Sequence, residues 1–169
     1  MFQTGRCPLQ LSTPLTNVTA FKGRDNVFSN FYPCTLHVFN RKFASSEHAY
    51  QFMKCKVTGN DDVAEEVAQT RDGLSAKRLV KQIQSTPDWE QKKIVVMKEI
   101  ISAKLSDCPE YCQALQTSKD IIAEAVPFDK FWSAGLKAED LMYVTPDKWP
   151  GQNKMGELHM QLRMEAFGR

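Results

Sequence analysis

Three polar side chains at helical spacing, Glu47, Gln51 and Lys54, are the residues whose types and positions could do chemistry. In an α-helix, residues at i, i+4 and i+7 share one face, so these three would lie together. A carboxylate can transfer protons, an amine can act as a nucleophile, and an amide between them can orient both. The ordinary alternative is that the charged pair is solvated on the surface of the helix.

The residues around these three predict the helix that would carry them. A serine cap, Ser45 or Ser46, can satisfy the free N–H groups of its first turn. The rest of the helix is rich in core-type residues, namely Ala49, Phe52, Met53 and Cys55. A polar face on such a helix has two explanations, solvation or the wall of a cavity.

Two aromatic-rich segments, residues 28–31 and 128–132, each contain an embedded polar residue, Asn30 or Asp129. Each aromatic, taken alone, is of a type usual in a core. A polar group among aromatics, however, must find partners or accept a desolvation cost of a few kcal/mol. Such segments suit a pocket that stacks a flat ring on an aromatic and hydrogen-bonds its edge or a sugar.

Glu124 and Asn153 each have two interpretations. Glu124 interrupts the strand-like apolar run 121–126, and strand alternation could direct it outward. It could equally point into the same cavity as Asp129, where apolar surroundings raise a carboxyl pKa and suit a general acid. Asn153 follows Gly151 and is either a helix cap or a site residue.

Composition narrows the class of protein. The 169 residues fit one domain with a sizeable core, and 42% are apolar and 25% charged. A net charge of +2 excludes a strong basic field for wholesale nucleic-acid binding, but not a small anionic ligand or a local contact. The five cysteines form no CxxC pair, and the three histidines form no cluster with them. We therefore expect no disulfide framework, no metal and no cofactor.

The hydrophobic pattern predicts a predominantly α protein with a small β component (α+β). We expect an irregular lead-in over residues 1–20 and a compact domain over 21–169. No signal peptide or membrane-length apolar run is visible, which favours a cytoplasmic protein, with the nucleus also open. We predict strands at 17–21, 34–39 and 121–126, a turn at 40–42 and a loop over 137–148. Further helices are predicted at 62–70, after a cap at Ser75, from Pro87, from Pro109 and after Asn153. The helix from Pro87 carries the clearest core stripe: Ile94, Met97, Ile101 and Leu105.

Four motifs in a fixed order identify a resemblance that covers residues 26–163. They are Phe-Ser-Asn-Phe (28–31), Ser-Glu-His-Ala-Tyr-Gln-x-x-Lys (46–54), Asp-x-Phe-Trp-x-x-Gly (129–135) and Gly-x-Asn-x-x-Gly-x-x-x-Met-x-x-Arg (151–163). Each is weak alone, but together and in this order they resemble the NADAR family, also called YbiA-like. Two departures, Ser133-Ala134 in place of a Gly-x start and His159 in place of Leu, put the exact substrate in doubt.

The resemblance implies an N-glycosidase that hydrolyses N-ribosidic bonds to an amino group on a nucleobase-like ring. It assigns catalysis to Lys54, Glu47 and Asp129. The implied substrate-binding residues are Asn30, Phe31, Gln51, Glu124, Trp132 and Asn153. With the sugar ring opened, the anomeric carbon is an imine that Lys54 can attack, giving a Schiff base, while Glu47 or Asp129 moves the proton. Direct attack by water between carboxylates is the alternative mechanism.

The implied partner is an ADP-ribosyl or phosphoribosyl nucleobase, including ADP-ribosylated nucleic acid. The insertion at 58–62 and the Ala-Lys-Arg-Leu segment (76–79) resemble stand-alone eukaryotic or viral members, and no fused synthesis domain is expected. The first expectation is therefore removal of ADP-ribose from guanine in DNA, RNA or a nucleoside. The alternatives are cleavage of phosphoribosylamino-pyrimidine intermediates of riboflavin synthesis, a non-catalytic ADP-ribose or nucleotide reader, and a scaffold with a decayed pocket.

Overall fold

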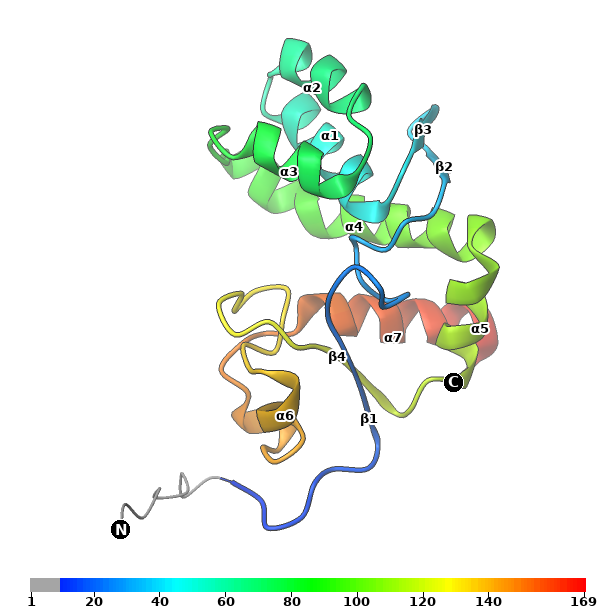
Figure 1. Ribbon diagram of the computed structural model, residues 1–169, viewed down its shortest axis with the longest axis vertical. Helices are drawn as coiled ribbons and strands as arrows, with labels where there is room; N and C mark the ends of the chain where they lie inside the picture. Colours follow the sequence, from blue (N-terminus) through cyan, green and yellow to red (C-terminus); the bar gives the residue numbers. More distant parts are fainter. Residues whose placement is uncertain (1–9) are drawn as a thin grey trace. The chain divides into compact units, whose positions relative to one another are not determined.

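The computed structural model describes residues 10–169, and helices predominate among them (Figure 1). The elements in chain order are β1 (Val18–Phe21), β2 (Leu36–Val38), β3 (Arg41–Phe43), α1 (Ser46–Val57), α2 (Asp61–Ala68), α3 (Gly73–Val80), α4 (Pro87–Asp107), α5 (Pro109–Thr117), β4 (Ile121–Glu124), α6 (Ala138–Leu141), the 3₁₀ turn η1 (Pro146–Lys148) and α7 (Lys154–Phe167). The predicted α+β class with a small β component is confirmed. The predicted lead-in falls partly on residues 1–9, which lie outside the described residues.

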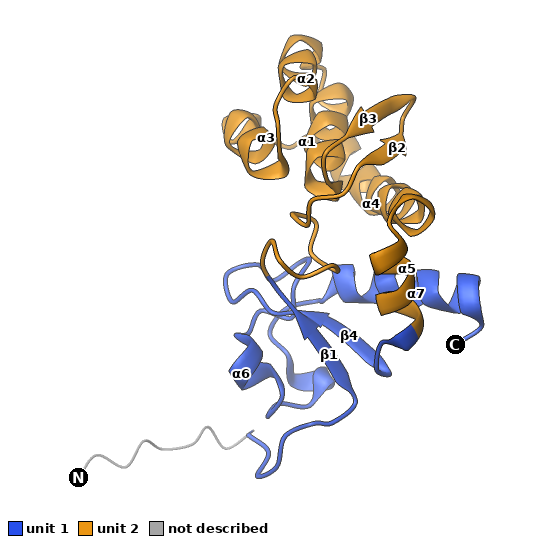
Figure 2. Ribbon diagram, turned by 45° about the vertical axis from the view of Figure 1, so that its right-hand side comes forward, with its two compact units in different colours: residues 1–22, 117–169 blue, residues 23–116 orange. Residues whose placement is uncertain are grey.

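The chain forms two compact units, coloured separately in Figure 2. Unit 1 combines the N-terminal segment up to Lys22 with residues 117–169, and unit 2 is residues 23–116. Unit 1 is thus discontinuous in sequence, and its parallel strand pair explains why. Parallel strands cannot be joined by a tight hairpin, so a long connection must separate β1 from β4.

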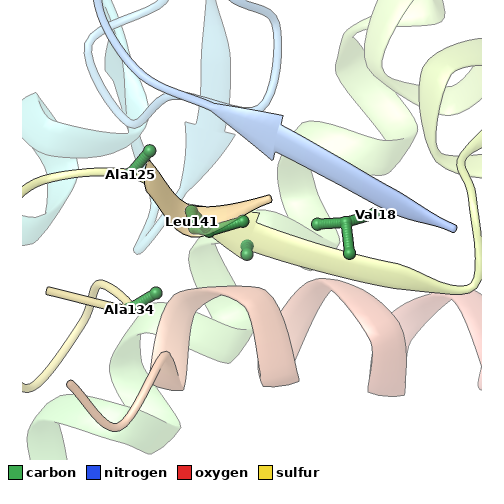
Figure 3. Close-up of a cluster of buried hydrophobic side chains, with 5 residues drawn as sticks. Val18, Ala125, Ala134 and Leu141 are labelled. Carbon is green, nitrogen blue, oxygen red and sulfur yellow. The ribbon is translucent and has the colours of Figure 1, made fainter. Parts of the chain in front are cut away.

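The core of unit 1 is built on the β1–β4 pair. Val18 pairs with Ile121 and Phe21 with Glu124, and α7 packs against β4. Small and branched side chains fill the cluster beside the strands, as Figure 3 shows for its labelled residues: Val18, Ala125, Ala134 and Leu141. Gly156 of α7 lies against β4 so closely that a Cβ there would overlap the carbonyl oxygen of Ile122.

Unit 2 is built around α1, which packs against α2, α3 and α4. Its aromatic contacts include Tyr50 of α1 with Trp89 of α4, whose ring centroids lie 5.1 Å apart. The β2–β3 hairpin turns through Phe39 and Asn40, both with positive φ, a pairing typical of a primed two-residue turn. The predicted turn at 40–42 was therefore placed too late, and β3 was missed.

The helix caps show where the sequence next to a helix start was enough to predict that start correctly. Ser45 Oγ accepts the N–H of His48, and Thr86 caps α4 ahead of Pro87, both as expected. The prediction that Ser75 caps the third helix is wrong. Asp72 is the cap, and its carboxylate accepts the N–H of Ser75 at 2.8 Å. Residues 137–148 were expected to be a loop, but they contain α6 and η1.

The apolar stripe of α4 contains a lysine that the periodicity did not reveal. Met97 and Ile101 are buried and Ile94 and Leu105 half-buried, while Lys104 is 0% exposed. Its ammonium donates to the carbonyls of Val27 (2.6 Å) and Ser29 (3.0 Å). Burial lowers the pKa of Lys104 to about 8.

Replacing Lys104 by methionine is expected to reduce the free energy of unfolding by about 1–3 kcal/mol, because two carbonyls lose their donor. The pH dependence has a definite sign. The unfolded lysine titrates near ~10.4 and the folded one near 8, so the unfolded chain binds more protons between these values. The stability contribution of Lys104 therefore rises with pH across this window. Denaturant titrations from about pH 7 to 10 should show that the rise is lost in Lys104→Met.

The control is Lys92→Met, since Lys92 is exposed and pairs only with Asp88 on the surface of α4. That change should move stability by less than about 0.5 kcal/mol. Equal stability of Lys104→Met and the wild type at every pH would contradict the structural role of this lysine.

Candidate active site

The polar face of α1 is largely withdrawn from solvent. Glu47 and Gln51 are each 7% exposed, and Gln51 Nε2 donates to Glu47 Oε1 at 2.7 Å. Simple solvation therefore does not account for either residue. Lys54, one turn further on, is half-buried and lines a cavity.

The start of α1 is held in place by its neighbours on three sides. The Glu47 N–H donates to the Asn30 carbonyl at 2.8 Å, which ties the 28–31 segment to the helix. His48 accepts the Ala44 N–H at Nδ1, and its Nε2 lies 2.7 Å from the Val67 carbonyl of α2. The histidine of the second motif is thus a structural connection between α1 and α2.

The third side is α3, which approaches α1 at Gly73. A Cβ at this glycine would lie 2.7 Å from Ser45 Oγ and 2.8 Å from Glu47 Cβ. Only the absence of a side chain allows this approach, because real Cβ contacts are longer. Gly73 therefore sets the distance between α3 and the carboxylate-bearing turn of α1.

A cavity of about 400 Å³ opens between α1 and α3. This volume lies within the range usual for small-molecule sites. Lys54 Nζ has no hydrogen bond or ion pair with any of residues 10–169. The lining residues are Phe31, Gln51, Lys54, Leu74, Lys77, Arg78, Val80 and Lys81.

A second cavity of about 230 Å³ shares Phe31 and Leu74 with the first. The Phe31 ring thus borders both spaces, and Lys77 Nζ lies 5.4 Å from its centroid. A half-buried ring at a cavity wall can stack on a flat ligand. The structure therefore brings Phe31, Gln51 and Lys54 together around one cavity, with Glu47 behind Gln51.

The other predicted site residues belong to unit 1. Asp129 Oδ1 accepts the N–H groups of Phe131 (3.0 Å) and Trp132 (2.9 Å), which shapes the aromatic turn. Its second oxygen, Oδ2, has no partner among the described residues. Trp132 is half-buried and packs edge-on against Phe131, with ring centroids 4.9 Å apart.

Asn153 joins the start of α7 to β4. Its Oδ1 accepts the Glu124 N–H at 3.1 Å, and its Nδ2 donates to the Ile122 carbonyl at 3.0 Å. It occupies the N-cap position with φ 52° but makes no capping hydrogen bond from its side chain. Glu124, the last residue of β4, is half-buried.

Both departures from the family pattern are packed inside unit 1. Ser133 is fully buried, and its hydroxyl donates to the Glu124 carbonyl and accepts the Val126 N–H, each at 2.7 Å. His159 is also fully buried, with its ring 5.4 Å from that of Phe21. These residues support the scaffold of unit 1.

The cavity-lining residues that sequence reasoning did not single out are the cations Lys77 and Arg78 of α3 and its C-cap residue Lys81. In the sequence, the Ala-Lys-Arg-Leu segment indicates only a likeness to the family. Positive charges at positions i, i+1 and i+4 can be read from the sequence, but the surface that they face cannot. Packing of α3 against α1 decides that these cations border the cavity that holds Lys54.

Comparison with solved structures supports the fold. The solution NMR structure of the E. coli protein YbiA superposes with a TM-score of 0.70, covering 94% of this chain and 89% of that one. At 22% identity this likeness shows the fold alone.

Comparison of sequences shows the family. The NADAR domain model matches residues 20–166, nearly the whole chain. The chain belongs to the NADAR family, and the resemblance inferred from the four motifs is confirmed.

One of the following three relatives carries a name that states an enzymatic activity. "N-glycosidase R617" of Acanthamoeba polyphaga mimivirus is 27% identical, over 83% of this chain and 87% of its own length. "Protein irg-1" of Caenorhabditis elegans is 29% identical, over 85% of this chain and 76% of its own length. "Riboflavin biosynthesis protein VVA0006" of Vibrio vulnificus is 32% identical over 81% of this chain, but the match spans only 34% of that protein. The prediction of an enzyme of the N-glycosidase class is confirmed at the level of these relatives.

Metal-ligand clusters and membrane-spanning helices are both absent from residues 10–169. No group of three or more His, Cys, Asp or Glu side chains is placed to hold a metal ion in this part of the chain. No helix within it is long and apolar enough to cross a membrane.

Gly73→Ala tests the close approach of α3 to the carboxylate turn. The added methyl must displace Ser45 or Glu47, so we expect a loss of about 1–3 kcal/mol in unfolding free energy, typical of overpacking. Thermal and denaturant unfolding would measure it. Glu66→Ala, on the exposed face of α2, is the matched control and should change stability little. A gain in stability at Gly73→Ala, as helix propensity alone would give, would show that α3 can move away freely.

Proposed function

We propose that this protein hydrolyses the N-ribosidic bond between ADP-ribose and the amino group of guanine, in a nucleoside or in nucleic acid. One observation carries the proposal. A buried carboxylate, Glu47, accepts a hydrogen bond from Gln51, which lines a cavity together with Lys54, and the Lys54 amine has no ion-pair partner among residues 10–169. A proton-transfer group and a candidate nucleophile thus occupy successive turns of one rigid helix.

The chemistry begins with opening of the ribose ring. Protonation of the ring oxygen breaks its bond to the anomeric carbon and leaves that carbon doubly bonded to the guanine amino nitrogen. The Lys54 amine adds to this carbon, the guanine nitrogen takes a proton and departs, and a Schiff base to Lys54 remains. Water then adds to the Schiff base, and the adduct collapses to the free sugar and the lysine amine.

Glu47 is the proposed carrier of these protons. Its oxygen Oε1 is already committed to Gln51, so the pair presents a fixed carboxylate. Asp129 of unit 1 is the alternative carrier, on the family resemblance alone. Trp132 and Asn30 are proposed to hold the base and the ribose.

The second candidate is cleavage of phosphoribosylamino-pyrimidines, and the names of the Vibrio vulnificus and maize riboflavin biosynthesis relatives favour it. This chain spans only 34% and 26% of those proteins. It matches 87% of the viral N-glycosidase and 76% of the worm protein. The ADP-ribosyl-guanine substrate is placed first because the Ala-Lys-Arg-Leu segment (76–79) resembles stand-alone eukaryotic or viral members of the family. A reader that binds ADP-ribose without cleaving it would need no buried carboxylate.

A direct assay separates these candidates. The protein would be incubated with ADP-ribosylated guanosine and, separately, with a phosphoribosylamino-pyrimidine, and the released base and sugar identified by mass spectrometry. We expect guanosine and ADP-ribose from the first substrate. Glu47→Gln keeps a hydrogen-bonding partner for Gln51 but cannot transfer a proton, so kcat should fall about 10²–10⁴-fold. Binding of ADP-ribose by calorimetry with no turnover of either substrate would establish the reader instead.

Borohydride trapping tests the Schiff base. Reduction during turnover should attach the sugar covalently to Lys54, detectable by peptide mass spectrometry, and Lys54→Arg should abolish both adduct and activity. Lys56→Arg is the control, because Lys56 lies on the same helix but pairs with Asp61 at 2.8 Å. Absence of an adduct together with near-full activity of Lys54→Arg would favour direct attack by water.

A further inference from the structure

Three cations, two in α3 and one at its C-cap, line the cavity and have no assigned role in the chemistry. Lys77, Arg78 and Lys81 all line the cavity of about 400 Å³ that also holds Lys54. We propose that these residues of α3 form the subsite that binds the phosphoryl groups attached to the ribose of the substrate. This proposal rests on the proposed function and names the part of the substrate that the α3 side of the cavity recognises.

The first argument is that this positive charge has no acidic partner. None of the three side chains forms an ion pair with any of residues 10–169, and no carboxylate is among the residues that line the cavity. Two other cations of unit 2 do have acidic partners, Arg41 with Glu65 and Lys92 with Asp88. An anion from outside the chain would supply the missing charge.

The second argument is that the arrangement costs stability in the absence of a ligand. Lys77 and Lys81 are four residues apart on one helix, a spacing at which like charges repel. Lys54 on α1 adds a further positive charge to the same cavity. Lys54 contributes only weakly to the lowered pKa of Glu90, which is caused mainly by hydrogen bonds from Lys93 and Ser85. Glu90 is thus already committed elsewhere.

The third argument is the chemistry of the groups themselves. A guanidinium such as that of Arg78 binds two phosphate oxygens at once, and flanking ammonium groups add charge-assisted hydrogen bonds. The Lys77 ammonium lies 5.4 Å from the Phe31 ring centroid, so a phosphate held there would lie close to a stacking surface. Phosphate charge beside an aromatic ring suits a nucleotide-like ligand. A diphosphate, as in ADP-ribose, and a single ribose phosphate share this chemistry.

Binding measurements test the subsite without requiring turnover. Calorimetry would compare ADP-ribose, ribose 5-phosphate and phosphate-free ribose against the wild type, Arg78→Ala and Lys77→Ala/Lys81→Ala. We expect each removed cation to weaken ADP-ribose binding about tenfold and to reduce its salt dependence. Tighter wild-type binding of ADP-ribose than of ribose 5-phosphate would identify the diphosphate as the ligand, and the reverse order the monophosphate.

Matched variants distinguish the subsite from general loss of fold or charge. Lys42→Ala, on exposed β3, removes the same charge elsewhere in unit 2 and should leave binding unchanged. Arg78→Lys should recover part of the affinity. In steady-state kinetics, Arg78→Ala should raise KM with little change in kcat, and a substrate lacking phosphates should show no difference from the wild type.

The outcomes separate this proposal from the proposed function. Phosphate-dependent binding that the α3 variants lose, with no cleavage of any substrate, would overturn the N-glycosidase activity and leave the subsite standing. Equal ADP-ribose affinity in the wild type and all α3 variants would overturn the subsite. Variants that impair cleavage in an oligonucleotide but not of the free nucleoside would also overturn it, because the cations would then contact the nucleic-acid backbone.

Discussion

The hydrogen bond from Gln51 to Glu47 inside α1 is the interaction on which the rest of the site depends. A polar group withdrawn from water is costly unless it has hydrogen-bond partners, and here the amide of the next turn donates to the Glu47 side chain. The helices α2, α3 and α4 pack around α1 and exclude solvent from this pair. The fixed geometry of this carboxylate is therefore a product of packing on all sides of one helix.

A second buried charge supports the aromatic side of the cavity. Lys104 on α4 reaches the carbonyls of Val27 and Ser29, immediately before Asn30 and Phe31. An irregular segment has few backbone partners of its own, so these two bonds satisfy groups that a strand or helix would satisfy internally. The cation thus acts at a distance from any ligand, by holding the segment whose carbonyl at Asn30 receives the Glu47 N–H.

Unit 1 uses polar motif residues largely to satisfy its own backbone. Asn153 bonds the backbone of Ile122 and Glu124 in β4, and Ser133 bonds the backbone of Glu124 and Val126. Arg163 donates to the carbonyls of Lys119 and Asp120 just before β4. A two-stranded sheet leaves many backbone groups unpaired, so side chains must complete it. Motif residues can therefore define this family through its scaffold as well as through its chemistry.

The sequence by itself determined the features that depend only on residues close together in the chain. The Ser45 cap, the Thr86-Pro87 start of α4 and the polar face of α1 all follow from hydrogen bonding or spacing within one helix. Only the tertiary structure decided which long-range partner each side chain meets. Lys104 is buried because the carbonyls of Val27 and Ser29 lie beside it. The cations of α3 line the Lys54 cavity because α3 packs closely against α1 at Gly73. Burial and charge compensation are set by residues distant in sequence, so spacing alone could not specify them.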